Sequence, residues 1–375
     1  MKTVNKLMVF GLISLFPVVA FSQNVTAGVS AVSTTTSVIG TEAPTTDTEV
    51  NTDGSYVVST TAFTDALQKV SDSINALEFS PEGWVRHLNV DSIASVNRFN
   101  TSVLKNVQIP YVNTIVDAVN SDIQDNKITE ADVIALQYAK ASAVAILNAR
   151  KEGRLKLVLV NISSYSLDAI DAVTGELAFR SKVIVGKHRA TPIFSTNITS
   201  LTVNPTWTPT LTILRGSVFP SVGKPKGYAA RTGMVAVGSD GSLIDLGSPD
   251  VTASEVRGLR IYQPAGDDNA LGVIRFNTDN KQAIYLHDTN ERYLFKKDKR
   301  AYSHGCIRVQ EWQKLGLWLS GWDADKLQEK LDTKETNTYR VDKVLVTVIN
   351  YPVDITNEGV ASLDDPYAVT KPKQG

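Results

Sequence analysis

The residues best suited to do chemistry in this chain lie at positions 303–308 (SHGCIR), which hold its only cysteine, Cys306. His304 stands two positions before the cysteine, and His287 stands nineteen positions before it. A thiol attacks as its thiolate, so it needs a base or a cation nearby to release its proton. Because two of the chain's four histidines fall in this window, the spacing predicts a cysteine nucleophile served by a histidine base.

The neighbours of the two residues fit this chemistry. His287 ends a strand-like run and is the better placed base, and Asp288 could orient its ring through either its backbone carbonyl or its side chain. Gly305 lets the backbone turn so that its own amide and that of Cys306 face a developing oxyanion. Arg308 could pair with a substrate carboxylate. The residues together suit acyl transfer or peptide-bond cleavage through a thioester.

Two other interpretations of the same residues stay open at this point. His287, Asp288, His304 and Cys306 could hold a metal ion, although their spacing matches no standard zinc signature. The group could also be purely structural, since a free cysteine often packs as a small apolar residue.

The composition limits the classes of function. The chain has 42% hydrophobic and 21% charged residues, which is ordinary for a globular protein that buries a core. Its 38 Lys and Arg residues against 39 Asp and Glu residues give a net charge of -1. No global field therefore favours nucleic acid. No glycine-rich phosphate loop follows a predicted strand, so we expect no nucleotide cofactor and assign no metal.

The N-terminus predicts export from the cytoplasm. Residues 1–22 have a cationic start, a short apolar run and small residues before Gln23, which is typical of a secretory signal peptide cleaved after Ser22. An uncleaved membrane anchor is the alternative, but the run is shorter than the roughly 20 residues of a spanning helix. Residues 23–61 are rich in Ser and Thr and poor in large apolar residues, so they predict a flexible tether.

A helical domain is predicted at residues 62–153. Apolar residues recur at three- and four-residue steps over 63–77, more weakly over 93–104, and again over 112–123. The clearest helix begins with Thr129 and Asp132 in a capping box, and its alanine-rich run ends at Gly153. We expect this domain to precede the residues that carry the chemistry.

From residue 154 to 375 the chain predicts a mainly β domain, giving an α+β protein. Loosely patterned residues 205–259 predict an insertion that acts as a lid. Residues 311–330 carry three tryptophans at near-helical spacing and predict a helix that supports the active loop. Period-two alternation predicts strands at 155–162, 166–170, 179–186, 200–203, 233–237, 272–276, 283–287 and 343–348.

His287, fifteen intervening residues and then SHGCIR resemble the signature of the L,D-transpeptidases with a YkuD-type catalytic domain. The similarity extends to blocks of the large Gram-negative members, which have a helical scaffold domain and a capping segment. These blocks are 185–187 (VGK) with 191–192 (TP), 204–209 (NPTWTP), 260–266 (RIYQPAG) with 269–272 (NALG), 285–289 (YLHDT) and 364–367 (DDPY).

The resemblance implies a periplasmic, cell-wall-associated enzyme with a mixed β-sandwich catalytic domain. Cys306 would attack the meso-diaminopimelate carbonyl of a peptidoglycan tetrapeptide stem, release D-Ala, and pass the acyl group to an acceptor stem as a 3-3 cross-link. His287 would be the base and acid and the Asp288 carbonyl would orient it, with Gly305 and His304 at the oxyanion. The predicted substrate-binding residues are Ser303, Tyr285, Trp207 and Arg308. Carbapenems would acylate the cysteine.

Other outcomes of the same thioester stay open. Water would give an L,D-carboxypeptidase or endopeptidase, and a free D-amino acid would give exchange. A catalytically silent cell-wall binding protein is the alternative from a different class, because a fold alone does not fix a function.

Overall fold

The structure is a computed structural model that describes five short strands before residue 59 and then residues 104–105, 107–125, 129–187, 189–356 and 359–367. The five strands are β1 (Asn5–Met8), β2 (Val18–Gln23), β3 (Val32–Ser37), β4 (Thr48–Val50) and β5 (Tyr56–Val58). The predicted helices at 63–77 and 93–104 lie outside the described residues except for Leu104. The signal peptide and the tether stay predictions.

The chain divides into two compact units, which are described separately. The first unit contains Met1–Arg180 and Leu345–Gly375, and the second contains Ser181–Val344. The division falls inside two long strands, β8 (Leu177–Gly186) and β17 (Asn337–Ile349).

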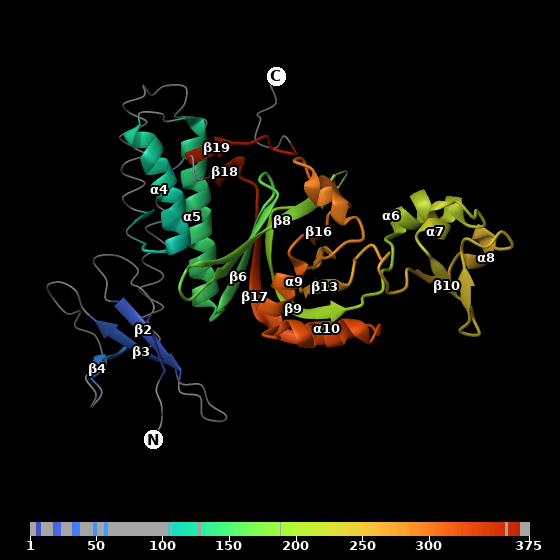
Figure 1. Cartoon of the computed structure of the whole chain (residues 1–375), viewed down its shortest axis with the longest axis horizontal. Coiled ribbons are helices and arrows are strands. Elements are labelled where there is room, and N and C mark those ends of the chain that lie inside the picture. The colour runs from blue at the N-terminus through green and yellow to red at the C-terminus, as the bar shows by residue number, and fades with distance from the viewer. Residues whose placement is uncertain are drawn as a thin grey trace. The chain divides into compact units, whose positions relative to one another are not determined.

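Two helices of the first unit, α4 (Pro110–Gln124) and α5 (Glu130–Lys151), lie side by side (Figure 1). The capping box predicted for α5 is confirmed, because the Asp132 carboxylate accepts the Thr129 N–H at 2.6 Å and the Thr129 hydroxyl at 3.0 Å. Gly153 follows the last turn with φ of +67°, as a left-handed terminator of the helix requires.

The helices of the first unit cover a small group of strands. The order of these strands is β17, β6 (Lys156–Asn161), β7 (Ser166–Asp171), with β6 parallel to β17 and antiparallel to β7. A hairpin of β18 (Val353–Thr356) and β19 (Gly359–Ser362) contacts both helices. One apolar core joins these elements, and its fully buried members include Ile109, Val112, Leu136, Ile146, Leu157 and Ile170.

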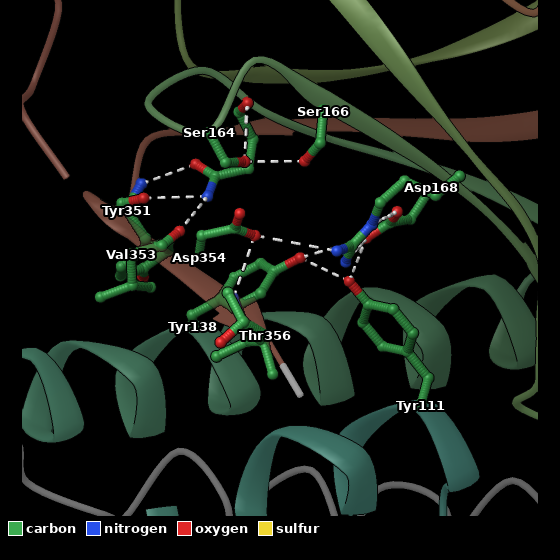
Figure 2. Close-up of polar contacts among 12 residues, drawn as sticks. Tyr111, Tyr138, Ser164, Ser166, Asp168, Tyr351, Val353, Asp354 and Thr356 are labelled. Carbon is green, nitrogen blue, oxygen red and sulfur yellow. Dashed lines mark hydrogen bonds and ion pairs between the residues drawn. The ribbon is translucent and has the colours of Figure 1, made fainter. Parts of the chain in front are cut away.

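A buried polar network lies between these helices and strands (Figure 2). The Asp168 carboxylate accepts two hydrogen bonds from the Arg180 guanidinium, at 2.6 and 2.9 Å, and further bonds from the hydroxyls of Tyr111 and Tyr138. The two tyrosine hydroxyls also bond to each other. Burial, followed by the charge of Asp168, raises the pKa of both tyrosines. Both hydroxyls therefore stay protonated, and this network ties α4 and α5 to β7 and β8.

Asp168→Asn is expected to lower the free energy of unfolding by about 2 kcal/mol, because it removes the charge that the Arg180 guanidinium and two buried tyrosine hydroxyls share. Asp117→Asn is the matched control, since Asp117 pairs with Lys105 on the surface, with both side chains at least half exposed, and surface pairs contribute about 0–1 kcal/mol. Urea unfolding followed by helical circular dichroism measures both. Equal losses in the two variants would show that the network does not stabilise the fold.

The strands of the second unit follow the order β15, β8, β16, β14, β13, β9, β17. The neighbours β14 and β16 are parallel, as are β15 and β8, whereas β13 pairs antiparallel with both β9 and β14. The α+β class is confirmed. The bounds not yet given are β9 (Phe194–Val203), β13 (Ile274–Thr278), β14 (Leu286–His287), β15 (Ala301–Ser303) and β16 (Ile307–Val309).

The predicted single helix at 311–330 is wrong, because the structure has two helices, α9 (Trp312–Ser320) and α10 (Ala324–Asp332). Gly321 ends α9 in the left-handed conformation with φ of +70°, and the Asp323 side chain caps α10 by accepting the Lys326 N–H at 2.8 Å. Gly321 and Asp323 therefore divide the segment into two helices, although its apolar residues follow a single helical spacing.

The insertion between β9 and β13, residues 205–263, is folded rather than loose. It closes at its base through a bridge between Trp207 and Gln263, so it extends past the predicted end at 259. Its sheet has the order β11, β10, β12, over a core of its own that includes Val218, Met234 and Ile261. Its elements are α6 (Leu211–Ile213), η1 (Leu214–Val218), η2 (Phe219–Ser221), α7 (Tyr228–Arg231), β10 (Val235–Val237), β11 (Leu243–Asp245), α8 (Ala253–Val256) and β12 (Arg260–Tyr262).

Within the described part of the chain, no helix combines the length and the apolar character needed to cross a membrane.

Candidate active site

Strand register gathers the predicted catalytic residues on one face of the second unit's sheet. On β14, His287 lies opposite Arg275 of β13 and opposite Arg308 of β16. Paired residues share a face, and residues two apart on a strand share it as well. Tyr285 and Cys306 each lie two residues earlier, and the Ile307 N–H to Tyr285 carbonyl bond, 3.1 Å, continues the pairing between them. The His287 ring and the Cys306 thiol are therefore diagonal neighbours.

The opposite face of the same strands is apolar and supported by a helix. Phe276, Leu286 and Ile307 are each at most 1% exposed. Helix α9 packs against this face. A Cβ built on Gly316 of α9 would lie only 3.2 Å from Cδ1 of Ile274, so the helix backbone approaches β13 closely. The predicted support of the active residues by the tryptophan-rich segment is thus provided by α9.

His287 is held as a neutral base. Its Nδ1 donates to the backbone carbonyl of Asp288, and because a carbonyl can only accept, the hydrogen lies on Nδ1 and Nε2 keeps its lone pair. Burial, then the positive charges of Arg308 and Arg275, lower the pKa of His287 to about 3, against the bond to Asp288. The imidazole is therefore neutral at physiological pH, with Nε2 able to take a proton.

The Asp288 side chain has a separate role, which decides between the two ways of orienting the base left open by the sequence. Its carboxylate is fully buried and accepts bonds from Arg292 Nε at 3.0 Å, Arg292 Nη2 at 2.5 Å and the Val273 N–H at 3.0 Å. The ring of His287 is thus oriented by the Asp288 carbonyl, while the Asp288 carboxylate anchors that residue in place.

The loop that carries the cysteine is shaped by Ser303. Its hydroxyl accepts the Gly305 N–H at 3.0 Å and donates to the Cys306 carbonyl at 2.6 Å. The Thr191 hydroxyl donates to the Gly305 carbonyl at 2.9 Å and accepts the Gly186 N–H at 2.9 Å. Gly305 has φ of +118°, which a residue with a Cβ rarely adopts. The loop is consequently fixed both by its own serine and by the segment after β8.

These bonds change two of the predicted roles. The Gly305 N–H donates to the Ser303 hydroxyl, so it is not free to donate to an oxyanion in this structure. The Cys306 N–H, in contrast, has no acceptor among the described residues. Ser303 is buried, and its hydroxyl is used inside the loop instead of facing a substrate. His304 is exposed. The Cys306 amide is the main-chain donor that this geometry leaves for an oxyanion.

The side chain of Cys306 forms no disulfide and is half-buried. Its Sγ lies 3.7 Å from the Ala283 carbonyl. Burial raises the pKa of Cys306, and the Tyr285 backbone N–H and then Arg189, Arg308 and Arg275 oppose this rise. With His287 neutral, the resting site holds a thiol and an imidazole instead of a thiolate and an imidazolium.

The other three residues predicted to bind substrate, Tyr285, Arg308 and Trp207, have different surroundings. The Tyr285 ring is 6.0 Å from the His287 ring, centre to centre. Arg308 pairs with Glu291 at 2.7 Å, and its buried Nε has no hydrogen-bond partner in the described part of the chain. Trp207 packs with the insertion's core instead.

Three residues near the site were missed by the sequence analysis. Arg275 alternates with apolar residues on a predicted strand, which could have indicated its face, and Arg189 precedes the TP pair of a block already noted. Tyr228 on α7 gave no signal. Burial, then the charge of Glu291, raises the pKa of Tyr228, and the charge of Arg308 opposes this rise.

The metal interpretation gains no support. Across the residues that the structure describes, no three His, Cys, Asp or Glu side chains are grouped so as to hold an ion.

Comparison with known proteins agrees with this geometry. The model of the YkuD L,D-transpeptidase catalytic domain matches residues 156–346. The chain belongs to the L,D-transpeptidase family. It is also 31% identical over 216 residues to a Haemophilus influenzae protein that bears the L,D-transpeptidase name, an alignment that covers 56% of this chain. The chain spans 44% of the length of that relative.

The neutral resting pair predicts how Cys306 reacts with iodoacetamide. With the pKa of the thiol raised and that of His287 near 3, the thiolate fraction should rise about tenfold per pH unit from about pH 5 to pH 8. His287→Ala should keep that slope, because the ring carries no charge in this range. A rate that is flat between about pH 5 and pH 7 would instead indicate a resting thiolate–imidazolium pair.

The anchoring of Asp288 predicts a matched pair of glycine variants. A Cβ on Gly272 would lie 2.1 Å from Asp288 Oδ2, so Gly272→Ala must displace the residue that orients His287. Gly233 is the matched control, because its φ of +59° is close to the +60° of Gly272, so alanine strains both backbones alike. No atom lies within 4 Å of the position that a Cβ on Gly233 would take. Catalytic turnover should fall about 100-fold in Gly272→Ala and little in Gly233→Ala. Similar turnover in both variants would contradict the role of Asp288.

Proposed function

We propose that this protein is a peptidoglycan L,D-transpeptidase that forms 3-3 cross-links through a thioester on Cys306. The observation that carries the proposal is the placing of a thiol and a carbonyl-oriented, neutral imidazole on one face of a YkuD domain. The substrate class comes from the family. The proposal extends to a periplasmic location at the cell wall, with a cleaved signal peptide at residues 1–22.

In the first half-reaction Cys306 Sγ attacks the carbonyl of meso-diaminopimelate, the third residue of the donor stem. Nε2 of His287 takes the thiol proton, and the Cys306 amide donates to the oxyanion. The C–N bond to D-Ala then breaks as His287 returns the proton to the leaving amine. The products are free D-Ala and a thioester between Cys306 and the stem.

In the second half-reaction an amine replaces the thiol. The side-chain amine of diaminopimelate on an acceptor stem attacks the thioester carbonyl, and Nε2 of His287 takes the amine's proton. The C–S bond breaks, and the proton passes from His287 to the sulfur. The site returns to its neutral resting state with one new amide bond, so that protons and bonds balance over the cycle.

The neutral resting pair suits this sequence of transfers. The buried site disfavours isolated charges, so Cys306 stays protonated until a carbonyl is present to accept the sulfur's electron pair. As the proton moves, the thiolate and the imidazolium stabilise each other at short range, which raises the basicity of His287 during the step. An uncharged thiol also limits reaction with electrophiles in the absence of substrate.

Acceptor choice is the finer part of the proposal. The same thioester attacked by water would give a carboxypeptidase or endopeptidase, and attacked by a free D-amino acid it would give exchange. Transfer to an amine is the outcome proposed here, because the chain belongs to the L,D-transpeptidase family. A carbapenem should acylate Cys306, since its lactam carbonyl presents the same electrophile.

Product analysis by mass spectrometry tests the proposal. The purified protein is incubated with disaccharide-tetrapeptide, and Cys306→Ala is the matched control because it removes only the sulfur. We expect a cross-linked dimer that has lost one D-Ala, absent from the control.

Other products would redirect or overturn the proposal. Tripeptide without a dimer would make the protein an L,D-carboxypeptidase, and exchange of D-Ala for an added D-amino acid would make it an exchange enzyme. Unchanged tetrapeptide, bound equally by both proteins, would leave the role of a cell-wall binding protein.

A further inference from the structure

A third arginine approaches the nucleophile from the segment between β8 and β9. A Cβ built on Gly305 would lie 3.7 Å from Cδ and 3.8 Å from Cγ of Arg189. The aliphatic stem of Arg189 thus lies over the glycine that precedes Cys306. The residue is exposed at the surface, and its guanidinium adds to the positive field that favours the Cys306 thiolate.

The position of Arg189 is tied to the catalytic loop. The Arg189 carbonyl would be 1.9 Å from a Cβ on Gly186, so only glycine at position 186 allows this approach of the backbone. The Thr191 hydroxyl joins Gly186 to the Gly305 carbonyl. The segment that bears Arg189 and the loop that bears Cys306 therefore form one bonded structure.

The three arginines around the thiol differ in their partners. Arg308 is paired with Glu291 at 2.7 Å. Arg275 donates through Nε to Asn277 at 2.6 Å and lies over the Tyr285 ring at 5.3 Å. Arg189 forms no ion pair or side-chain hydrogen bond with any residue that the structure describes. Its five donors are available to a ligand.

We propose that Arg189 is a specificity-determining residue that binds the free α-carboxylate of the residue released from the donor. This inference rests on the proposed function. When the donor carbonyl is bonded to Sγ, the carboxylate carbon of the next residue lies at most ~3.6 Å further along the chain. A guanidinium one atom beyond Cδ, next to Gly305, lies within reach of that group. Its planar fork matches a carboxylate through two hydrogen bonds.

Binding of the terminal carboxylate by Arg189 restricts the choice of donor. A donor must end one residue after the attacked carbonyl and must carry a free negative charge there. Stems with an amidated terminal residue should be poor donors, because they offer Arg189 an amide in place of a carboxylate.

The test compares two tetrapeptide donors that differ only in their terminus, D-Ala or D-alaninamide. We expect kcat/KM of the wild type to favour the free carboxylate by about 10- to 100-fold. In Arg189→Ala that preference should fall to within about threefold, through loss of turnover of the carboxylate donor alone. Differences in leaving-group chemistry between the donors cancel in the ratio of wild type to variant.

Two further variants keep the test decisive. Lys187→Ala removes another exposed cation of the same segment and should keep the wild-type preference. Arg189→Lys keeps the charge but loses the planar fork, so it should retain part of the preference. Iodoacetamide reactivity at fixed pH, measured for each variant, reports separately on the thiol.

The outcomes distinguish the inference from the function. If Arg189→Ala keeps the preference, or slows both donors by the same factor, the residue does not bind the terminal carboxylate and the inference fails while the function stands. A wild type that shows no preference overturns the inference as well. A wild type that consumes neither donor overturns the proposed function, and with it the inference.

Discussion

The hydrogen bond from Nδ1 of His287 to the carbonyl of Asp288 is the interaction on which the rest of the site depends. It fixes the tautomer, and with it which ring nitrogen keeps the lone pair that can take a proton. A backbone carbonyl is only as fixed as its residue, and the Asp288 carboxylate supplies that fixity through Arg292 and the Val273 amide. Asp288 therefore anchors the carbonyl that orients His287, and its negative charge pairs with Arg292.

Burial sets the electrostatics of the site, and the arginines only moderate it. Removing the thiol and the imidazole from water disfavours both charged forms, so the resting state is neutral although three arginines surround it. The same positive field favours the thiolate and disfavours the imidazolium. A substrate that brings a carboxylate to this site would reduce the field at His287, and so make the base stronger when it is needed.

Much of the fold and the site follows from sequence patterns that are local. Alternation places β6 and β7 close to their observed bounds, whereas β17 begins at Asn337, well before its predicted start at 343, and Thr129 and Asp132 mark the start of α5. The histidine and cysteine could be recognised because their spacing is typical of one family. What the sequence could not show depends on contacts between distant residues. Strands β15 and β16 have three residues each, too few for a period, and the register that aligns Arg275 with His287 is set by pairing.

The intact mass of the protein after brief mixing with tetrapeptide donor and quenching in acid tests the proposed thioester on Cys306. A thioester intermediate would appear as a covalent adduct equal to the donor stem without its terminal D-Ala. The adduct should map to Cys306 after digestion, and an acceptor amine should discharge it into cross-linked product. A protein that releases D-Ala while its own mass never changes would contradict the thioester at the centre of the account.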